Sequence, residues 1–128
     1  MLTKGEFEIN YELQITNYET KKNNKYNFRK MEEEIIKALK TVYDPEIAVN
    51  IYDLGLIYKI DIDAQKNVCI DMTFTAPSCP LADFILEDVR QKVEGIDDVR
   101  SAQINLVFEP EWNQDMMTEE AKFELGLL

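Results

Sequence analysis

The chain has 128 residues, of which 45% are hydrophobic, enough to bury one continuous core but too few for two ordinary domains. Its net charge of -11 opposes the phosphates of nucleic acids and the anionic surface of membranes, so we expect neither as a partner. The absence of histidine removes the commonest general base and the commonest transition-metal ligand, which excludes most hydrolase and zinc-site classes.

Targeting signals and cysteine usage indicate the compartment. No apolar run approaches the roughly 18 residues of a membrane span, and the first residues lack the apolar stretch of a secretory signal. Two cysteines are too few for a disulfide scaffold, and a reducing compartment keeps both as thiols. The sequence therefore predicts a cytoplasmic protein.

The chain begins with a polar segment, residues 1–28, which we interpret as an N-terminal extension whose order is left open. Residues 29–128 are interpreted as the folded domain. Apolar residues recur at spacings of three and four from Phe28 to Tyr43, which predicts an amphipathic helix that ends at Asp44 and Pro45.

Two alternating segments follow and predict an antiparallel hairpin around a turn at residues 64–67. Its expected inward-facing side chains are Leu56, Tyr58, Ile60 and Ile62 in the first strand, and Val68, Ile70, Met72 and Phe74 in the second.

A second helix is predicted from Pro80 to about Glu94, with Gly95 at its C-terminal end. Its expected apolar stripe is Leu81, Phe84, Ile85, Val89 and Val93. A third strand follows at residues 99–108, and Thr118 is expected to cap a short helix over residues 119–125. The residues of that strand expected on one side are Ala102, Ile104, Leu106 and Phe108.

The resulting order is helix, strand, strand, helix, strand, helix. Strand faces that alternate cleanly between apolar and polar indicate a sheet covered by helices on one side only. The predicted fold class is α+β, a two-layer sandwich.

The strongest candidate for a functional residue is Cys79. Pro80 suits the first position of a helix, which would make Cys79 the N-cap residue and expose its sulfur to free backbone amides. That environment favours the thiolate, whereas Asp83 disfavours it, so the net effect stays open. A small residue that fills a tight loop is an equally good interpretation, and Cys69, in mid-strand, is not expected to act directly.

Ligand counting restricts the metal hypothesis. An iron-sulfur cluster usually takes four thiolates, and this chain has two cysteines on different elements. Cys79 is thus at most one ligand of a site completed by a partner, a small thiol or a second subunit, with Asp44, Glu46 or Asp53 as candidate oxygen ligands. The commoner explanation is that Asp44 and Asp53 form turns and that Glu46 is solvated, and Thr75 is close enough in sequence to hydrogen-bond the cysteine loop.

Several blocks of sequence resemble the metal-sulfur cluster biosynthetic domain family, which includes the SufT and PaaD proteins. They cover roughly residues 29–128 in the order expected for that family. The blocks are Asp44–Ile47, Ile51–Tyr58, Met72–Leu81, Pro110–Trp112, and Met117–Ala121 with Leu125–Leu127. Departures are modest: Ala48 stands where a glycine or proline is common, and Glu111 interrupts a usual Pro-Pro-Trp.

The resemblance implies an iron-sulfur cluster assembly-like fold and an accessory role in the maturation of iron-sulfur proteins. The family's reactive cysteine falls on Cys79, its acidic motif on Asp44 and Glu46, and its Asp-Leu-Gly-Leu turn on Asp53–Leu56. The implied partners are iron-sulfur apoproteins and the assembly machinery, with a homodimer left open. We expect no tightly bound cofactor, only transient iron or a transient iron-sulfur cluster.

Two other classes stay open. The domain is alternatively a pure interaction module, a scaffold of a multi-subunit oxygenase in which Cys79 is structural. A thiol enzyme is a weaker alternative, because without histidine it would need Asp44 or Glu46 as its base. The primary hypothesis is therefore non-enzymatic.

Overall fold

A computed structural model describes residues 27–77 and 80–128. The chain divides into two compact units, Met1–Met31 and Glu32–Leu128. Of the first unit, residues 27–31 are described and are helical. The predicted extension at residues 1–28 therefore lies almost wholly outside the described residues and stays a prediction. The described helices contain no segment long and apolar enough to cross a membrane.

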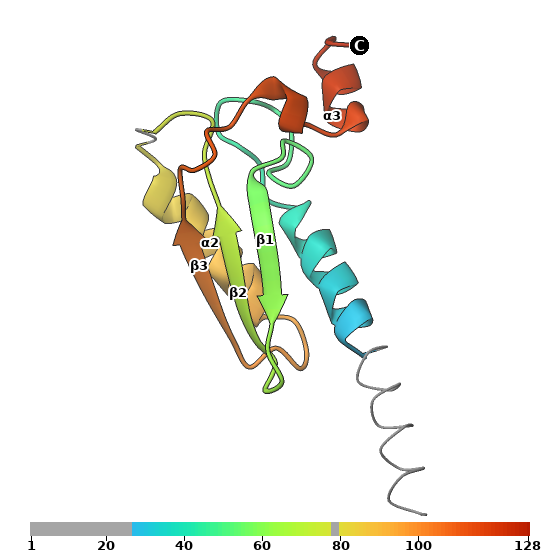
Figure 1. Cartoon of the computed structure of the whole chain (residues 1–128), viewed down its shortest axis with the longest axis vertical. Coiled ribbons are helices and arrows are strands. Elements are labelled where there is room, and N and C mark those ends of the chain that lie inside the picture. The colour runs from blue at the N-terminus through green and yellow to red at the C-terminus, as the bar shows by residue number, and fades with distance from the viewer. Residues whose placement is uncertain (1–26, 78–79) are drawn as a thin grey trace, which may run out of the picture. The chain divides into compact units, whose positions relative to one another are not determined.

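The second unit contains a three-stranded sheet with the strand order β1-β2-β3 (Figure 1). β1 (Ile57–Ile62) pairs antiparallel with β2 (Asn67–Met72), which confirms the predicted hairpin. β3 (Ser101–Leu106) pairs parallel with β2, and α2 (Ala82–Glu94) makes the crossover between them. Such a parallel connection places the C-terminal ends of β2 and β3 at one edge of the sheet.

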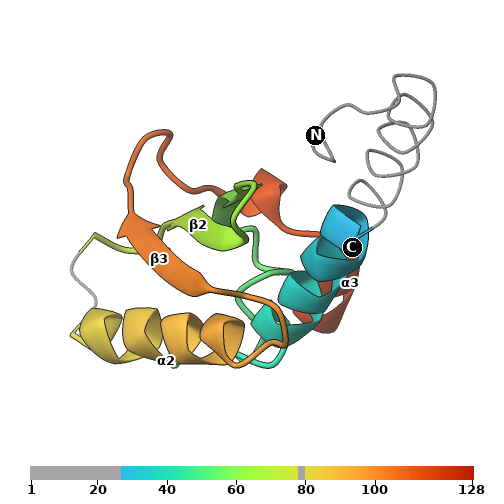
Figure 2. The same cartoon turned by 90° about the horizontal axis from the view of Figure 1, so that it is seen from below.

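The core lies on the face of the sheet that α2 covers (Figure 2). Val68, Ile70 and Met72 of β2 are buried, whereas the alternate Cys69 and Asp71 are half-buried. This alternation confirms a two-layer α+β fold with one open sheet face. The other buried apolar side chains of this unit include Ile35, Leu39, Ile51, Leu54, Leu56, Ile85, Val89 and Val93.

The first helix ends earlier than predicted. It covers residues 27–39, four residues short of Tyr43. The chain leaves the helix because Val42 and its neighbours pair with a returning segment: the Ile51 amide donates to the Val42 carbonyl at 2.8 Å, and Tyr43 forms an isolated bridge with Asn50. Val42 is still buried, as the helical pattern suggested, but a loop places it there.

The prediction that Tyr58 faces the core is wrong, because β1 contains a bulge. Ile57 pairs with Met72 and Lys59 with Asp71, so Tyr58 is an extra residue in the ladder. It shares an open hollow with Lys59 and Asp71, and its hydroxyl donates to the Pro110 carbonyl at 2.7 Å. Partial burial raises the pKa of the Tyr58 phenol.

The start of α2 also differs from the prediction. The helix begins at Ala82, and Leu81 occupies the N-cap position without any side-chain capping bond. Pro80 is therefore not the first helical residue, and the placement of Cys79 as N-cap was wrong. Leu81 and Phe84 are exposed, so the buried stripe of α2 consists of Ile85, Val89 and Val93.

The third strand and the last helix lie close to their predicted ranges. β3 ends at Leu106, and Ala102, Ile104 and Leu106 pair with Val68, Ile70 and Met72, as expected for residues on one side of the strand. Ala102 is buried, whereas Leu106 and Phe108 are exposed. α3 (Glu119–Glu124) is capped as predicted, because the Thr118 hydroxyl accepts a hydrogen bond from the Ala121 amide.

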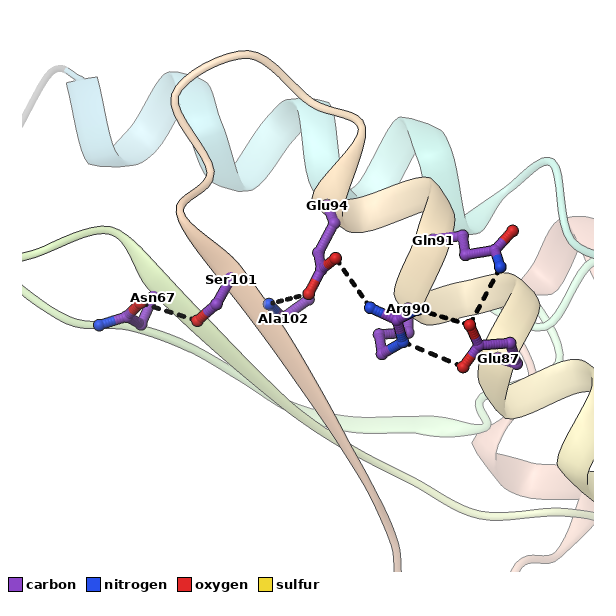
Figure 3. A network of polar contacts seen from close by, with 7 residues as sticks. All are labelled: Asn67, Glu87, Arg90, Gln91, Glu94, Ser101 and Ala102. Carbon is purple, nitrogen blue, oxygen red and sulfur yellow. Dashed lines mark hydrogen bonds and ion pairs between the residues drawn. The ribbon is translucent and has the colours of Figure 1, made fainter.

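A polar network ties α2 to β3 (Figure 3). The Glu94 carboxylate accepts from the Ala102 amide at 3.1 Å and from Arg90 at 2.8 Å, and Arg90 also pairs with Glu87. The hydrogen bond from Arg90 lowers the pKa of Glu87 to about 2, and the hydrogen bond from Ala102 lowers the pKa of Glu94. The ionised carboxylates therefore stabilise the helix-to-strand connection.

We expect Glu94→Ala to lower the midpoint of urea unfolding at neutral pH, with a diminishing effect in acid. The folded-state pKa of Glu94 lies below its ordinary value of 4.5, so its contribution is present above that pH. The contribution is lost as the pH falls through the folded-state pKa. Urea titrations at several pH values measure this, with the exposed Glu33→Ala as control. An equal effect of Glu94→Ala at every pH would contradict the assignment.

Candidate functional site

The candidate site lies where the C-terminal ends of β2 and β3 meet. After Met72, the chain runs through Thr73 and Thr75 to Pro77, and the next described residue is Pro80, just before α2. Ser78 and Cys79 lie outside the described residues. The site is therefore described by the residues that precede and follow these two, 73–77 and 80–81.

A cavity of about 230 Å³ adjoins this segment. The side chains around it come from the end of β2 and from the segment after β3: Thr73, Phe74, Thr75, Pro77, Phe108, Glu109, Glu111 and Trp112. Trp112 is held in place because its indole nitrogen donates to the Leu54 carbonyl at 2.7 Å. The predicted supporting residue Thr75 is half-buried in this cavity wall, and the nearby Thr73 is buried.

Exposed apolar side chains flank the same segment. Leu81 and Phe84 lie at the start of α2, and Phe84 is 75% exposed. Leu106 and Phe108 lie at the end of β3 and just beyond it, also exposed. We call these four residues the apolar rim. The periodicities placed Leu81 and Phe84 on the apolar stripe of a helix, and Leu106 and Phe108 on one side of a strand, and did not indicate that the four are exposed together.

The predicted acidic residues organise turns. One Asp44 carboxylate oxygen accepts hydrogen bonds from the amides of Glu46 and Ile47 at 2.8 and 2.9 Å, and Asp44 is 8% exposed. The Glu46 side chain is exposed. Neither residue lines the cavity beside Thr75, so the described structure does not bring this acidic pair together with Thr75. Asp44 therefore fits the turn-forming interpretation.

Asp53 has a partner that the sequence did not indicate. The Asn50 amide donates to Asp53 Oδ2 at 2.9 Å, and Asn50 Oδ1 accepts from the Asp53 backbone amide at 2.8 Å. Asp53 Oδ1 is buried and accepts no hydrogen bond from the described residues. The Asp53 carbonyl also accepts from the Thr118 amide, which links this turn to the cap of α3.

Metal-binding capacity is low in the described residues. No three histidine, cysteine, aspartate or glutamate side chains among residues 27–77 and 80–128 are grouped so that they could hold a metal ion. Cys69 is half-buried on the open sheet face, where the Asn105 amide lies 3.2 Å from its sulfur and 3.0 Å from Asp71. These described residues therefore do not fit a resident metal.

Comparison with known proteins identifies the family. Residues 32–106 match the model of the family described as iron-sulfur cluster assembly protein. The chain belongs to this family. That membership confirms the predicted resemblance, and the fold of the family's α+β domain is the one described above.

Relatives in the iron-sulfur cluster assembly family cover most of the chain. The Fe-S protein maturation auxiliary factor of Porphyromonas gingivalis is 60% identical over 101 residues, which are 79% of this chain and 96% of that protein. The Fe-S protein maturation auxiliary factor SufT of Staphylococcus aureus is 36% identical over 67% of this chain and 98% of its own length. A crystal structure of the DUF59 domain of unknown function from Bacillus anthracis superposes with a TM-score of 0.72 at 34% identity, covering 78% of this chain and 95% of that one.

Proposed function

We propose that this protein is a non-enzymatic accessory factor in the maturation of iron-sulfur proteins, in which Cys79 receives or presents iron or a cluster. The observation that carries the proposal is the 60% identity to a protein named Fe-S protein maturation auxiliary factor, over 96% of that protein's length. The cluster or iron is a transient cargo in this proposal, not a resident cofactor. A cytoplasmic location belongs to the same proposal, because a reducing compartment keeps the thiol available.

The apolar rim supports a role in presenting a cargo to another protein. Exposed apolar side chains in the rim lose contact with water only when a partner covers them, so they favour an apoprotein docking beside the cysteine. Thr75 contributes a hydroxyl to the adjoining cavity wall. Asp44 and Asp53 support the site by holding the turns of the preceding loop, and Glu46 supplies an exposed charge for partner contact.

The experiment that tests this function compares cells with and without the protein. We expect its loss to lower the specific activity of iron-sulfur enzymes several-fold, and the wild-type chain to restore it. Phe84→Ser should restore only part of that activity, because losing an exposed aromatic anchor weakens docking about tenfold while changing the unfolding free energy by less than about 0.5 kcal/mol.

The matched control for this variant is Leu127→Ser, because Leu127 is exposed but does not belong to the apolar rim. Unchanged iron-sulfur enzyme activities in the strain without the protein would overturn the proposed function. Full restoration by Phe84→Ser would leave the function standing and remove the apolar rim as its docking surface.

A further inference from the structure

A second hollow lies beside α3, separate from the cavity near Thr75. It has a volume of about 720 Å³. This lies within the range of roughly 300–1,000 Å³ that is typical of ligand pockets. Its walls come from the end of the first helix, the Asn50–Asp53 turn and the C-terminal segment. None of its lining residues lines the cavity near Thr75.

Negative charge dominates the walls of this hollow. Four carboxylates line it, from Asp53, Glu119, Glu120 and Glu124, against the single ammonium of Lys40. The Lys40 nitrogen also lies over the Tyr52 ring, 5.5 Å from its centroid. The carboxylates do not form a group that could hold a metal ion, so the charge is spread along the wall. A spread of negative charge suits an extended cationic ligand better than a single metal ion.

The same hollow is bordered by large exposed apolar side chains. Tyr43, Phe123 and Leu128 all line it, and Phe123 is 74% exposed although Ala121 on the same helix is fully buried. A six-residue helix that buries one face and leaves a phenylalanine outside has an unpartnered apolar side chain. Apolar and acidic groups in one hollow match a ligand that is both apolar and basic.

We propose that this hollow docks a basic, apolar segment of a partner protein. The charge of the chain argues against a second copy as the occupant, because a net charge of -11 would bring like charges together at this surface. Nucleic acid and anionic membrane are excluded by the same charge. The Asn50–Asp53 pair and the bond from Thr118 to the Asp53 carbonyl hold the two walls in register before any ligand binds.

None of the four residues of the apolar rim carries a charge, whereas four carboxylates line this hollow. Binding at the hollow should therefore fall as the salt concentration rises, through screening of its carboxylates. The proposal does not depend on Cys79, so its outcome is independent of the proposed maturation function.

The test uses the full-length chain and a short fluorescent peptide in which arginine alternates with leucine. Fluorescence anisotropy measures the binding of the peptide at low and at high salt. We expect Phe123→Ser to weaken binding about tenfold, as for loss of an aromatic anchor. The matched control, Leu127→Ser, removes an exposed apolar side chain that neither lines the hollow nor belongs to the apolar rim, and it should bind like the wild type. Both variants should keep the wild-type circular dichroism spectrum.

A second comparison tests the charges. Glu119→Gln, Glu120→Gln and Glu124→Gln together should weaken binding about threefold to tenfold and flatten its salt dependence. The control is the set Glu32→Gln, Glu33→Gln and Asp97→Asn, which removes the same number of charges at positions elsewhere on the chain.

Three outcomes would overturn the proposal. Equal losses in the two charge sets would mean that the peptide senses only the net charge. Equal binding of a peptide in which glutamate replaces arginine would remove the requirement for a basic ligand. A wild-type dimer that Phe123→Ser converts to a monomer, in sedimentation experiments, would identify a second copy as the occupant.

Discussion

Cys79→Ser is expected to leave the activity of iron-sulfur enzymes at the level of cells that lack the protein. A serine hydroxyl stays protonated at neutral pH and is a poor ligand for iron and iron-sulfur clusters. The cargo would therefore lose its attachment point. Activity of a client enzyme, normalised to the amount of that enzyme and of the variant, measures the effect. The free energy of unfolding should change by less than about 1 kcal/mol, as is usual for a conservative change of this size.

Cys69→Ser is the matched control, because it makes the same chemical change at a half-buried position on the open sheet face. It should restore activity like the wild type, since the Asn105 amide can donate to a hydroxyl as it does toward the sulfur. Full activity of Cys79→Ser would contradict our proposal and favour the interaction module. Iron and sulfide analysis of both variants, prepared anaerobically, would show whether cargo is lost with the thiol.

The reason for expecting reactivity at Cys79 has changed. The predicted N-cap position would have placed its sulfur against free helix amides, but Leu81 occupies that position. The expectation now depends on the family assignment and on the apolar rim beside the loop. A direct measurement of the thiol pKa therefore tests the activation of this thiol independently of the maturation assay.

Gly55→Ala should be strongly destabilising for a single added methyl group, by about 3 kcal/mol or more. Gly55 has φ +82°, a region that costs other residues roughly 1–2 kcal/mol. An added Cβ would also overlap the carbonyl oxygen of Met116, part of the segment that packs over this turn. The Asp53–Leu56 turn and the C-terminal segment would have to separate. Thermal and urea unfolding measure the loss.

Two other glycines separate the causes of that loss. Gly126 has φ +75°, and no atom lies within 4 Å of the point that a Cβ would occupy, so Gly126→Ala reports the backbone cost alone, about 1–2 kcal/mol. Gly95 has φ -75° at the end of α2, and Gly95→Ala should change stability by less than about 1 kcal/mol. Equal effects at Gly55 and Gly126 would mean that the Met116 carbonyl moves aside without cost.

Local chemistry explains where prediction succeeded. The hairpin followed from strict alternation, and its turn is closed by the Asp63 carboxylate, which accepts from the amides of Gln65 and Asn67. The Thr118 cap was likewise predicted from residues next to one another in the chain. Each of these features was signalled by residue types in its own neighbourhood of the sequence.

The predictions that the structure contradicts failed for a different reason. Apolar periodicity says which side chains lie on one face, but it does not say how far the covering element extends. Phe84 of α2 and Phe108, just after β3, are both exposed, so they are surface residues beside the candidate site. The bulge at Tyr58 depends on the register with β2, and the Asn50–Asp53 pair depends on the path of the loop.

Cys79 and its flanking motif were evident from the sequence alone, as were the element order and the one-sided sheet, because residue type and periodicity are local properties. The tertiary structure alone decided that apolar side chains stay exposed at the start of α2 and the end of β3, and that carboxylates of α3 meet the Asp53 turn in one hollow. Those features arise mainly between segments that are distant in the chain, and burial and charge at such contacts depend on which surfaces the fold brings together.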